Sequence, residues 1–347
     1  MKIGVVGCGY WGSKHIRVLC GIGEAHQVVA IDARDSRLVE LKQAFPSLEV
    51  ASSLDDVLDQ CDAFVIATPP STHASLALTA LGAGKHVLVE KPLATRSVDA
   101  RRMMEAAAES GAILMAGHTF EYNAAVWKLR ELVESGELGS IYYLDSARLN
   151  LGLYQSDVNV IWDLAPHDVS IFNHVLGARP SVVQAWGARH GHRELEDVAY
   201  IRLQYFEPDV TATIHVSWLD PCKVRRVTVV GSQKMAVYND LSNDERIRIY
   251  DKGLAGTEDG ALQDVPMSYR YGEIRSPFVA FDEPLGIQDR EFVQAALTGQ
   301  QPLTDGANGC DVVRTLEAAE ISLRESRPVH VDEIDMDTVV LSDLVEV

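Results

Sequence analysis

With 347 residues, of which 47% are hydrophobic and 23% charged, the chain is long enough for two domains with full cores, and its composition excludes a disordered protein. The net charge of −19 at pH 7, with a pI near 4.9, excludes binding of nucleic acid or anionic lipid through neutralised phosphates. No run approaches the roughly 18 apolar residues of a membrane span, and the five cysteines are scattered, so we expect a cytoplasmic protein with reduced thiols.

The chain starts with a glycine-rich motif between a predicted strand and a predicted helix. Residues 2–6 are apolar, Gly7-Cys8-Gly9-Tyr10-Trp11-Gly12 follows at once, and a helical pattern continues to residue 19. In this G-x-G-x-x-G context the first glycine permits a tight turn, the second lets a pyrophosphate approach the backbone, and the third lets the helix pack against the sheet. The motif therefore predicts a dinucleotide whose pyrophosphate rests on the helix N-terminus.

An acidic residue follows the second predicted strand at the spacing that such a site requires. Residues 27–31 form that strand, and Asp32 comes 20 residues after Gly12. A carboxylate there accepts hydrogen bonds from the adenosine ribose hydroxyls and repels a 2′-phosphate, which favours NAD. Arg34 is close enough in sequence to pair with a 2′-phosphate, so NADP remains an alternative.

Residues 86–93, which read His-Val-Leu-Val-Glu-Lys-Pro-Leu, carry the most informative strand end. Three consecutive apolar residues indicate a strand that is buried on both faces, as in parallel sheets. Pro92 cannot continue a central strand, so it fixes the direction in which Lys91 leaves the strand. Because ligands of open α/β sheets bind beyond the carboxyl ends of the strands, we predict that Lys91 is catalytic, although an isolated Lys-Pro turn is more often a solvated lysine.

These motifs, in this order, resemble the Gfo/Idh/MocA oxidoreductase family, which includes glucose–fructose oxidoreductase and inositol dehydrogenase and acts on sugars and cyclitols. The resemblance rests on the glycine motif, on the turn Thr68-Pro69-Pro70 with His73, and on Glu90-Lys91-Pro92, and it covers nearly the whole chain. It implies a cis peptide bond before Pro92. The residues expected to bind the dinucleotide are Gly7, Gly9, Tyr10, Trp11, Gly12, Asp32, Arg34, Thr68, Pro69, His73, Glu90 and Lys91.

The second half of the chain consists mainly of long strands that follow one another without helices. The expected strands are residues 141–149, 182–188, 198–206, 210–218, 226–230 and 234–238. We therefore expect an α/β Rossmann domain at residues 1–120 and an α+β domain at 121–347 with a large, mostly antiparallel open sheet. The apolar face of this sheet is expected to form a homodimer or homotetramer, and the C-terminal helices to pack back on the domain junction.

One helix in this half carries two candidate catalytic residues. Asp163 and His167 are four residues apart, so they share a helix face, and the helix continues to residue 176. Because Pro166 fits only in the first turn of a helix, we expect Asp163 at the N-cap or just inside it. From the residues alone, an N-cap aspartate and an ordinary helical histidine are an equally good interpretation. The resemblance implies instead that His167 is the proton shuttle, with Asp163 and Lys91 as its partners.

The chemistry implied by the resemblance needs a base for a hydroxyl proton, and histidine serves near neutral pH without perturbation. Lys91 would donate to the substrate oxygen and Glu90 would hold Lys91 in place. Candidate substrate contacts have aromatic, amide or charged groups that suit a polyhydroxylated ring: Tyr122, Arg148, Asn150, Tyr154, Trp162, Asp163, His167 and Asn173. The run Lys223-Val224-Arg225-Arg226 would suit a diphosphate, although a solvated strand start is the simpler interpretation.

The sequence thus predicts an NAD(P)-dependent oxidoreductase acting on a ring alcohol or ketone of a sugar or nucleotide-sugar, with an inositol 2-dehydrogenase as the alternative. A catalytically silent dinucleotide sensor is the alternative from another class; the set of Lys91, Asp163 and His167 argues against it. His190-Gly191-His192 with His215 lacks a cysteine or carboxylate at ligand spacing, so no metal is expected. The expected partner is a small carbohydrate.

Overall fold

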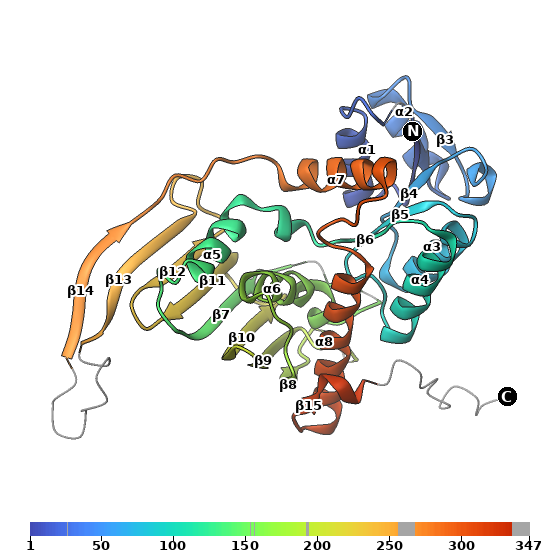
Figure 1. Ribbon diagram of the computed structural model, residues 1–347. Helices are drawn as coiled ribbons and strands as arrows, with labels where there is room; N and C mark the ends of the chain where they lie inside the picture. The colour runs from blue at the N-terminus through green and yellow to red at the C-terminus, as the bar shows by residue number, and fades with distance from the viewer. Residues whose placement is uncertain (26, 153, 156, 192–193, 256–267, 335–347) are drawn as a thin grey trace. The chain divides into compact units, whose positions relative to one another are not determined.

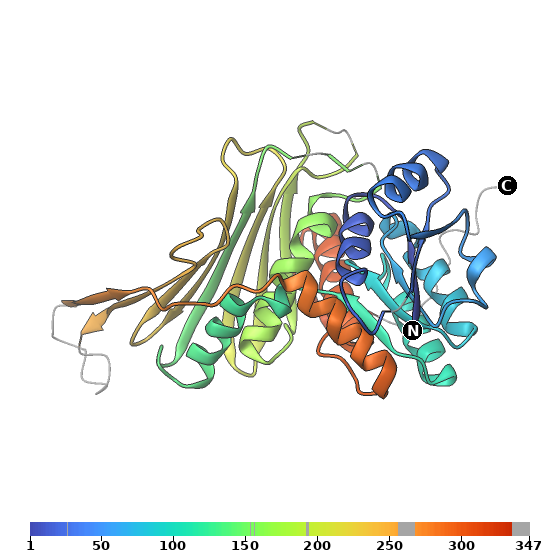
Figure 2. The same cartoon turned by 90° about the horizontal axis from the view of Figure 1, so that it is seen from above.

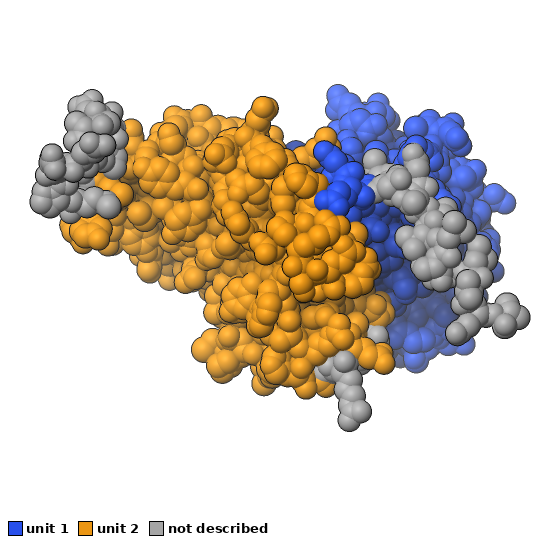
Figure 3. All heavy atoms as spheres, turned by 90° about the horizontal axis from the view of Figure 1, so that it is seen from below, with its two compact units in different colours: residues 1–119, 283–317, 332–347 blue, residues 120–282, 318–331 orange. Residues whose placement is uncertain are grey.

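The computed structural model describes residues 1–347 except 26, 153, 156, 192–193, 256–267 and 335–347. The described residues form two compact units, which Figure 3 shows in different colours. Unit 1 contains residues 1–119, 283–317 and those described after 331, and unit 2 contains the described residues of 120–282 and 318–331. The first boundary lies one residue from the expected one, whereas 283–317 belongs to unit 1 and not to the second domain.

Unit 1 is built on a six-stranded sheet in which every pair of neighbouring strands is parallel. Its order is β3-β2-β1-β4-β5-β6, with β1 (Lys2–Val6), β2 (Gln27–Ile31), β3 (Glu49–Ala51), β4 (Ala63–Ile66), β5 (His86–Glu90) and β6 (Leu114–Gly117). The helices between them are α1 (Tyr10–Leu19), α2 (Asp35–Ala44), α3 (His73–Gly82) and α4 (Ser97–Ser110). The predicted Rossmann arrangement is confirmed. Residues 87–89 of β5 are completely buried, as expected for a central parallel strand.

The C-terminal segment completes unit 1 through α7 (Pro284–Thr298) and the first part of α8 (Gly306–Glu325). The helix α7 packs on α1, and Figure 1 shows the two helices side by side. The segment between α7 and α8 adds to β6: the Ala116 amide donates to the Thr304 carbonyl over 2.7 Å, and the Thr304 hydroxyl donates to the Ala116 carbonyl over 2.7 Å. These two hydrogen bonds explain why the segment joins the first unit.

Unit 2 is built on a nine-stranded sheet with the order β14-β13-β12-β11-β7-β10-β9-β8-β15. All neighbouring strands are antiparallel except β7 and β10, so the predicted, mostly antiparallel sheet is confirmed. The strands are β7 (Ile141–Leu149), β8 (Val182–Ala188), β9 (Val198–Phe206), β10 (Asp209–Ser217), β11 (Val224–Gly231), β12 (Met235–Asn239), β13 (Ile247–Ala255), β14 (Ser268–Arg275) and β15 (Val329–His330). The last three were not anticipated from the sequence.

Two helices, α5 (Ala124–Glu134) and α6 (Val160–Leu176), cover one face of this sheet (Figure 2). Side chains along β9 alternate between the two faces of the sheet, and the apolar ones face the helices. Ala199, Ile201, Leu203 and Tyr205 lie on the covered face and are buried, while Tyr200 and Phe206 on the other face are about half exposed. Among the described residues, no helix combines the length and the apolar composition needed to cross a membrane.

Candidate functional site

The glycine-rich loop of unit 1 joins β1 to α1, and its three glycines have different surroundings. Gly7 has φ +86°, and a Cβ there would lie 2.7 Å from the Ala67 carbonyl oxygen, so only glycine fits this turn. A Cβ on Gly12 would lie 1.8 Å from the Gly7 oxygen, so any side chain would push α1 away from the loop. Nothing lies within 4 Å of a Cβ built on Gly9, which leaves open space against the backbone for a ligand.

The N-terminus of α1 suits a pyrophosphate. Gly9 is the N-cap residue, the described residues provide no side-chain cap, and the first turn carries no acidic residue, so the helix dipole and the first amides are available to an anion. Tyr10 and Trp11 are exposed in this turn, and the Lys14 ammonium lies 4.7 Å from the centre of the Tyr10 ring. An open backbone at Gly9 next to a positive helix end therefore fits a dinucleotide.

Asp32 at the end of β2 is buried and fully engaged in hydrogen bonds. It accepts from the Cys8 amide over 2.8 Å, from the Arg34 amide over 2.9 Å and from the Arg34 guanidinium over 3.0 Å to each oxygen. Burial opposes ionisation, but these hydrogen bonds and the charge of Arg34 outweigh it and lower the pKa of Asp32 to about 2. The carboxylate is thus charged at neutral pH and is tied to the glycine-rich loop.

Lys91 follows β5 directly, and its surroundings within unit 1 are well defined. The Lys91–Pro92 peptide bond is cis, as the resemblance implies. The Glu90 carboxylate accepts the Lys91 amide over 3.2 Å. His73 is buried between two carbonyl oxygens, with its Nδ1 2.8 Å from Pro92 O and its Nε2 2.9 Å from Thr68 O. His73 therefore joins the turn after β4 to the turn after Lys91.

In unit 2 the helix α6 begins at Val160, one turn earlier than expected. The Asn159 side chain caps it by accepting from the amides of Ile161 and Trp162 over 3.1 Å and 3.3 Å. The N-cap is therefore Asn159 and not Asp163, which lies just inside the helix, in its first turn, with its amide donating to the Asn159 carbonyl. Pro166 consequently lies inside the helix, at its seventh residue.

Asp163 and His167 are partly exposed, whereas the residues between them are buried. The Trp218 indole N–H donates to Oδ2 of Asp163 over 2.9 Å. The His167 ring meets the Phe120 ring edge to face, with 5.0 Å between the centres. One face of α6 thus presents a carboxylate and an imidazole one helical turn apart, each held by an aromatic neighbour.

A buried ion pair supports this face of α6. The Arg148 guanidinium of β7 donates to both oxygens of Asp168 over 2.8 Å and 3.2 Å, and its central carbon lies 4.6 Å from the centre of the Phe120 ring. Arg148 and Asp168 are both almost completely buried. Because Phe120 also contacts His167, the pair fixes the aromatic side chain against which the imidazole rests.

Comparisons with known proteins decide the family. Residues 1–118 match the model described as the oxidoreductase family with an NAD-binding Rossmann fold, and residues 126–237 match the GFO/IDH/MocA C-terminal domain. The chain belongs to the GFO/IDH/MocA oxidoreductase family. It is 31% identical to UDP-N-acetylglucosamine 3-dehydrogenase from Acidithiobacillus ferrooxidans over 93% of this chain and 96% of that enzyme.

Other members of the family are similar over the same length. Myo-inositol 2-dehydrogenase from Thermotoga maritima is 25% identical over 96% of this chain and 99% of the relative. The crystal structure of GenD2 from gentamicin A biosynthesis, in complex with NAD, superimposes with a TM-score of 0.79 at 25% identity over 95% of this chain and 96% of that chain. The structure of the Acidithiobacillus enzyme gives a TM-score of 0.76 at 25% identity over 94% of this chain and 98% of that one.

The candidate substrate residues fall into two groups in this GFO/IDH/MocA protein. Asn150 and Tyr154 lie with Asp163 around Trp218: the Tyr154 and Trp218 ring centres are 5.3 Å apart, and the backbone N–H of Asn150 donates to the carbonyl of the residue before Trp218. Tyr122, Arg148, Trp162 and Asn173 instead make their contacts within the unit. Tyr122, Arg148 and Trp162 are buried, Trp162 donates to Glu320, and the Asn173 amide oxygen accepts from the Tyr205 hydroxyl.

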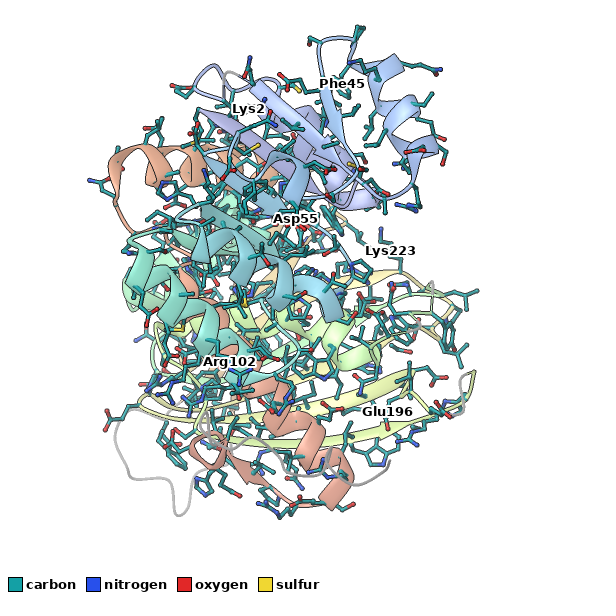
Figure 4. All side chains as sticks on the ribbon, turned by 90° about the vertical axis from the view of Figure 1, so that its right-hand side faces the viewer. Lys2, Phe45, Asp55, Arg102, Glu196 and Lys223 are labelled. Atoms are coloured by element: carbon teal, nitrogen blue, oxygen red, sulfur yellow. The ribbon has the colours of Figure 1, made fainter. Side chains whose placement is uncertain are left out.

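Trp218 and Arg225 lie near Asp163, and neither was among the predicted sugar contacts. Trp218 follows the last residue of β10 and carries the indole that holds Asp163. Arg225 of β11 donates to the Leu149 carbonyl over 2.8 Å and to the Asn150 side chain, and burial next to Arg148 lowers its pKa to about 10. Lys223 extends from the loop before β11 (Figure 4) and is exposed. The sequence signal for Trp218 was its place at the end of a predicted strand. The signal for Arg225 was its place in a basic run at the start of a predicted strand.

The histidines considered as metal ligands have other neighbours where they are described. His190 lies 2.8 Å from Asp197, and His215 stacks on Tyr200 with 4.0 Å between ring centres. His192 lies outside the described residues. Within the described part of the chain, no group of three or more His, Cys, Asp or Glu side chains is arranged to hold a metal ion.

Proposed function

We propose that this protein is an NAD-dependent dehydrogenase that interconverts a secondary alcohol and a ketone on the ring of a sugar or nucleotide-sugar. The observation that carries the proposal is the common edge of the unit 1 sheet: the open backbone at Gly9 follows β1, and Lys91 follows β5. An NAD-binding family, and relatives named as dehydrogenases of an inositol and of UDP-N-acetylglucosamine, support it.

Gly7, Gly9, Gly12 and the first turn of α1 would hold the pyrophosphate of NAD, and Asp32 would hold the adenosine ribose. Bound NAD supplies the acceptor for the hydride that leaves the substrate carbon. Asp32 is occupied by Arg34, so a ribose hydroxyl at this carboxylate has to displace the guanidinium. This competition makes Arg34 available for a 2′-phosphate, and NADP is therefore proposed as a weaker second cofactor.

Lys91 is proposed to donate a hydrogen bond to the substrate oxygen, which gains negative charge as the alcohol loses its proton. A fixed ammonium stabilises that charge more in the transition state than in the ground state, which is what accelerates the reaction. Lys91 follows a strand whose residues 87–89 are completely buried, and its own amide is held by Glu90, so its main chain is fixed before the substrate arrives.

His167 is proposed to take the hydroxyl proton during oxidation and to return it during reduction. Histidine is the side chain whose ordinary pKa permits both directions near neutral pH. Asp163, one turn away on the same face, is proposed to orient the substrate hydroxyl or the imidazole, and Trp218 holds one of its oxygens. Asn150 and Tyr154 are proposed to contact the sugar, whereas the buried Arg148 is proposed to position Phe120 and His167.

We further propose that the protein forms a homodimer or homotetramer through the uncovered face of the unit 2 sheet. Trp186, Tyr200 and His215 form a continuous row of rings on this face, with 5.8 Å and 4.0 Å between successive centres. Exposed aromatic side chains in such a row are typical of protein interfaces. The five cysteines are free, which fits the reducing cytoplasm as the proposed compartment.

The test is the absorbance of NADH or NADPH during incubation with free sugars, inositols and nucleotide-sugars, each with both cofactors. Turnover of a ring alcohol with NAD supports the proposal, and activity confined to inositols selects the inositol dehydrogenase instead. Tight binding of NAD without turnover of any compound in the panel would contradict the enzymatic proposal and favour a dinucleotide sensor.

A further inference from the structure

Behind Lys91, three ionisable side chains from distant parts of unit 1 meet in its interior. His15 of α1 lies between Glu90 at the end of β5 and Asp289 of α7, and His15 and Asp289 are completely buried. The His15 Nδ1 is 2.9 Å and 3.0 Å from the two oxygens of Asp289, and its Nε2 is 3.0 Å from Oε1 of Glu90. We call these three residues the His15 network.

The charges of the network determine the protonation state of His15. Burial alone would lower the pKa of His15, but the two carboxylates outweigh burial and raise this pKa to about 10. The ring is therefore an imidazolium at neutral pH, and both of its N–H groups donate. Burial also raises the pKa of Asp289, whereas the hydrogen bond and charge of His15, with the charge of Lys91, lower the pKa of Glu90. Glu90 is thus held as a carboxylate in a buried place.

The network ends at the main chain of Lys91. One Glu90 oxygen faces His15, and the other accepts the Lys91 amide over 3.2 Å. His15 is also one turn after Gly12, on the helix whose N-terminus fits the dinucleotide. Gln288, which precedes Asp289 on α7, interacts with Asp289 and accepts from the Thr119 hydroxyl over 2.8 Å. The His15 ring therefore joins three elements: the helix α1, whose N-terminus fits the dinucleotide, the strand β5, which leads to Lys91, and the helix α7 of the C-terminal segment.

We propose that His15, held by Asp289, is a positioning residue for Lys91: by fixing the Glu90 carboxylate it fixes the backbone from which the lysine reaches the substrate. The inference rests on the proposed function of Lys91. It assigns to the C-terminal helix α7 a role in catalysis, because Asp289 supplies the second carboxylate that keeps His15 charged. His15 and Asp289 touch neither cofactor nor substrate in this role.

Two variants test the proposal, with one matched control. His15→Gln keeps a donor but removes the charge, and Asp289→Asn leaves His15 with a single carboxylate. His86→Gln is the control, because His86 lies at the opposite end of β5, where its Nδ1 accepts the Ile113 amide over 3.0 Å. For His15→Gln we expect kcat to fall by roughly 10- to 100-fold, with the affinity for NAD and the KM of the substrate nearly unchanged. His86→Gln should keep the wild-type kcat.

The pH profile separates positioning from a purely structural role. With one carboxylate removed, His15 should lose its proton at a lower pH than in the wild type. The kcat of Asp289→Asn should therefore recover toward the wild-type value as the pH is lowered, whereas that of His15→Gln should not. Should His15→Gln fail to fold, the pH-dependent recovery of Asp289→Asn still decides the question. A deficit of Asp289→Asn that is the same at every pH would refute the proposal.

A readout without activity keeps this proposal distinct from the proposed function. In protein labelled with ¹⁵N at lysine, the Lys91 amide is identified by its loss in Lys91→Arg, and its hydrogen exchange is measured. Exchange should be faster in His15→Gln than in His86→Gln or the wild type. If wild-type turnover depends on Lys91 but His15→Gln retains full kcat and slow exchange, the positioning role is wrong and the proposed function stands. If no substrate is turned over, the proposed function fails, and unchanged exchange of the Lys91 amide would still overturn the link from His15.

Discussion

The buried charge of His15 predicts that the stability of this protein falls as the pH rises above neutrality. The pKa of His15 is about 6.5 when the chain is unfolded and about 10 in the folded protein. Because the folded pKa is the higher one, the stabilisation is complete below the unfolded pKa and is lost as the pH rises toward the folded pKa. Between these values, unfolding releases about one proton from this side chain.

The size of the effect follows from that proton. One proton corresponds to about 1.4 kcal/mol for each pH unit, so the free energy of unfolding should fall by about 2 kcal/mol between about pH 7 and about pH 8.5. The upper end of this range reaches the ordinary pKa of cysteine, so thiols whose pKa is raised by burial, such as Cys8 with a pKa of about 12, add to the loss of stability from there upward. The contribution of the network is therefore taken as the difference from a reference variant that keeps these thiols.

Denaturant unfolding at a series of pH values measures this slope. The reference is a variant in which the three members are made neutral together, as His15→Gln, Glu90→Gln and Asp289→Asn, so that no group of the network can titrate. Between about pH 7 and about pH 8.5 the reference should lose about 2 kcal/mol less than the wild type. Equal slopes for the two proteins would refute the reasoning, because the alkaline sensitivity would then come from other groups.

Three further predictions concern other parts of the molecule. Arg148→Met leaves the Asp168 carboxylate buried without its partner and should reduce the free energy of unfolding by about 3–5 kcal/mol, measured by denaturant titration, whereas replacing both by apolar residues should recover much of the loss. Asp32→Ser frees Arg34 and should weaken NAD binding about 10- to 100-fold while leaving NADP binding less affected, measured by fluorescence titration; equal losses for both cofactors would contradict it. Tyr200→Glu places a charge in the exposed aromatic row and should dissociate the proposed homo-oligomer in sedimentation; an unchanged sedimentation coefficient would contradict the proposed interface.

The parts of the site that follow from local pattern could be predicted from the sequence. The turn of Gly7 and the end of the strand before Lys91 are encoded by neighbouring residues, because a positive φ needs glycine and a proline ends a central strand. The N-cap of α6 was predicted wrongly for a local reason. The rule that proline occupies the first turn outweighed the ordinary N-cap signal of Asn159, and the helix accommodates Pro166 in its interior.

Contacts between residues that are far apart in the sequence could not be predicted from local patterns. His15 and Asp289 are 274 residues apart, and each taken alone resembles a common helical residue. Arg148 follows a pattern that suits a substrate contact, but the fold turns it toward Asp168 on α6. Such pairs are set by which elements pack together, and a single sequence does not record that choice.

The account depends most on Lys91, and one comparison tests it directly. The turnover of a responsive substrate and the dissociation constant of NAD are measured for Lys91→Ala and for Lys85→Ala, which removes the lysine just before the same strand. We predict that Lys91→Ala loses at least roughly 100-fold in kcat while still binding NAD, and that Lys85→Ala retains wild-type kcat. Full turnover by Lys91→Ala would contradict the central claim that this lysine stabilises the substrate oxygen.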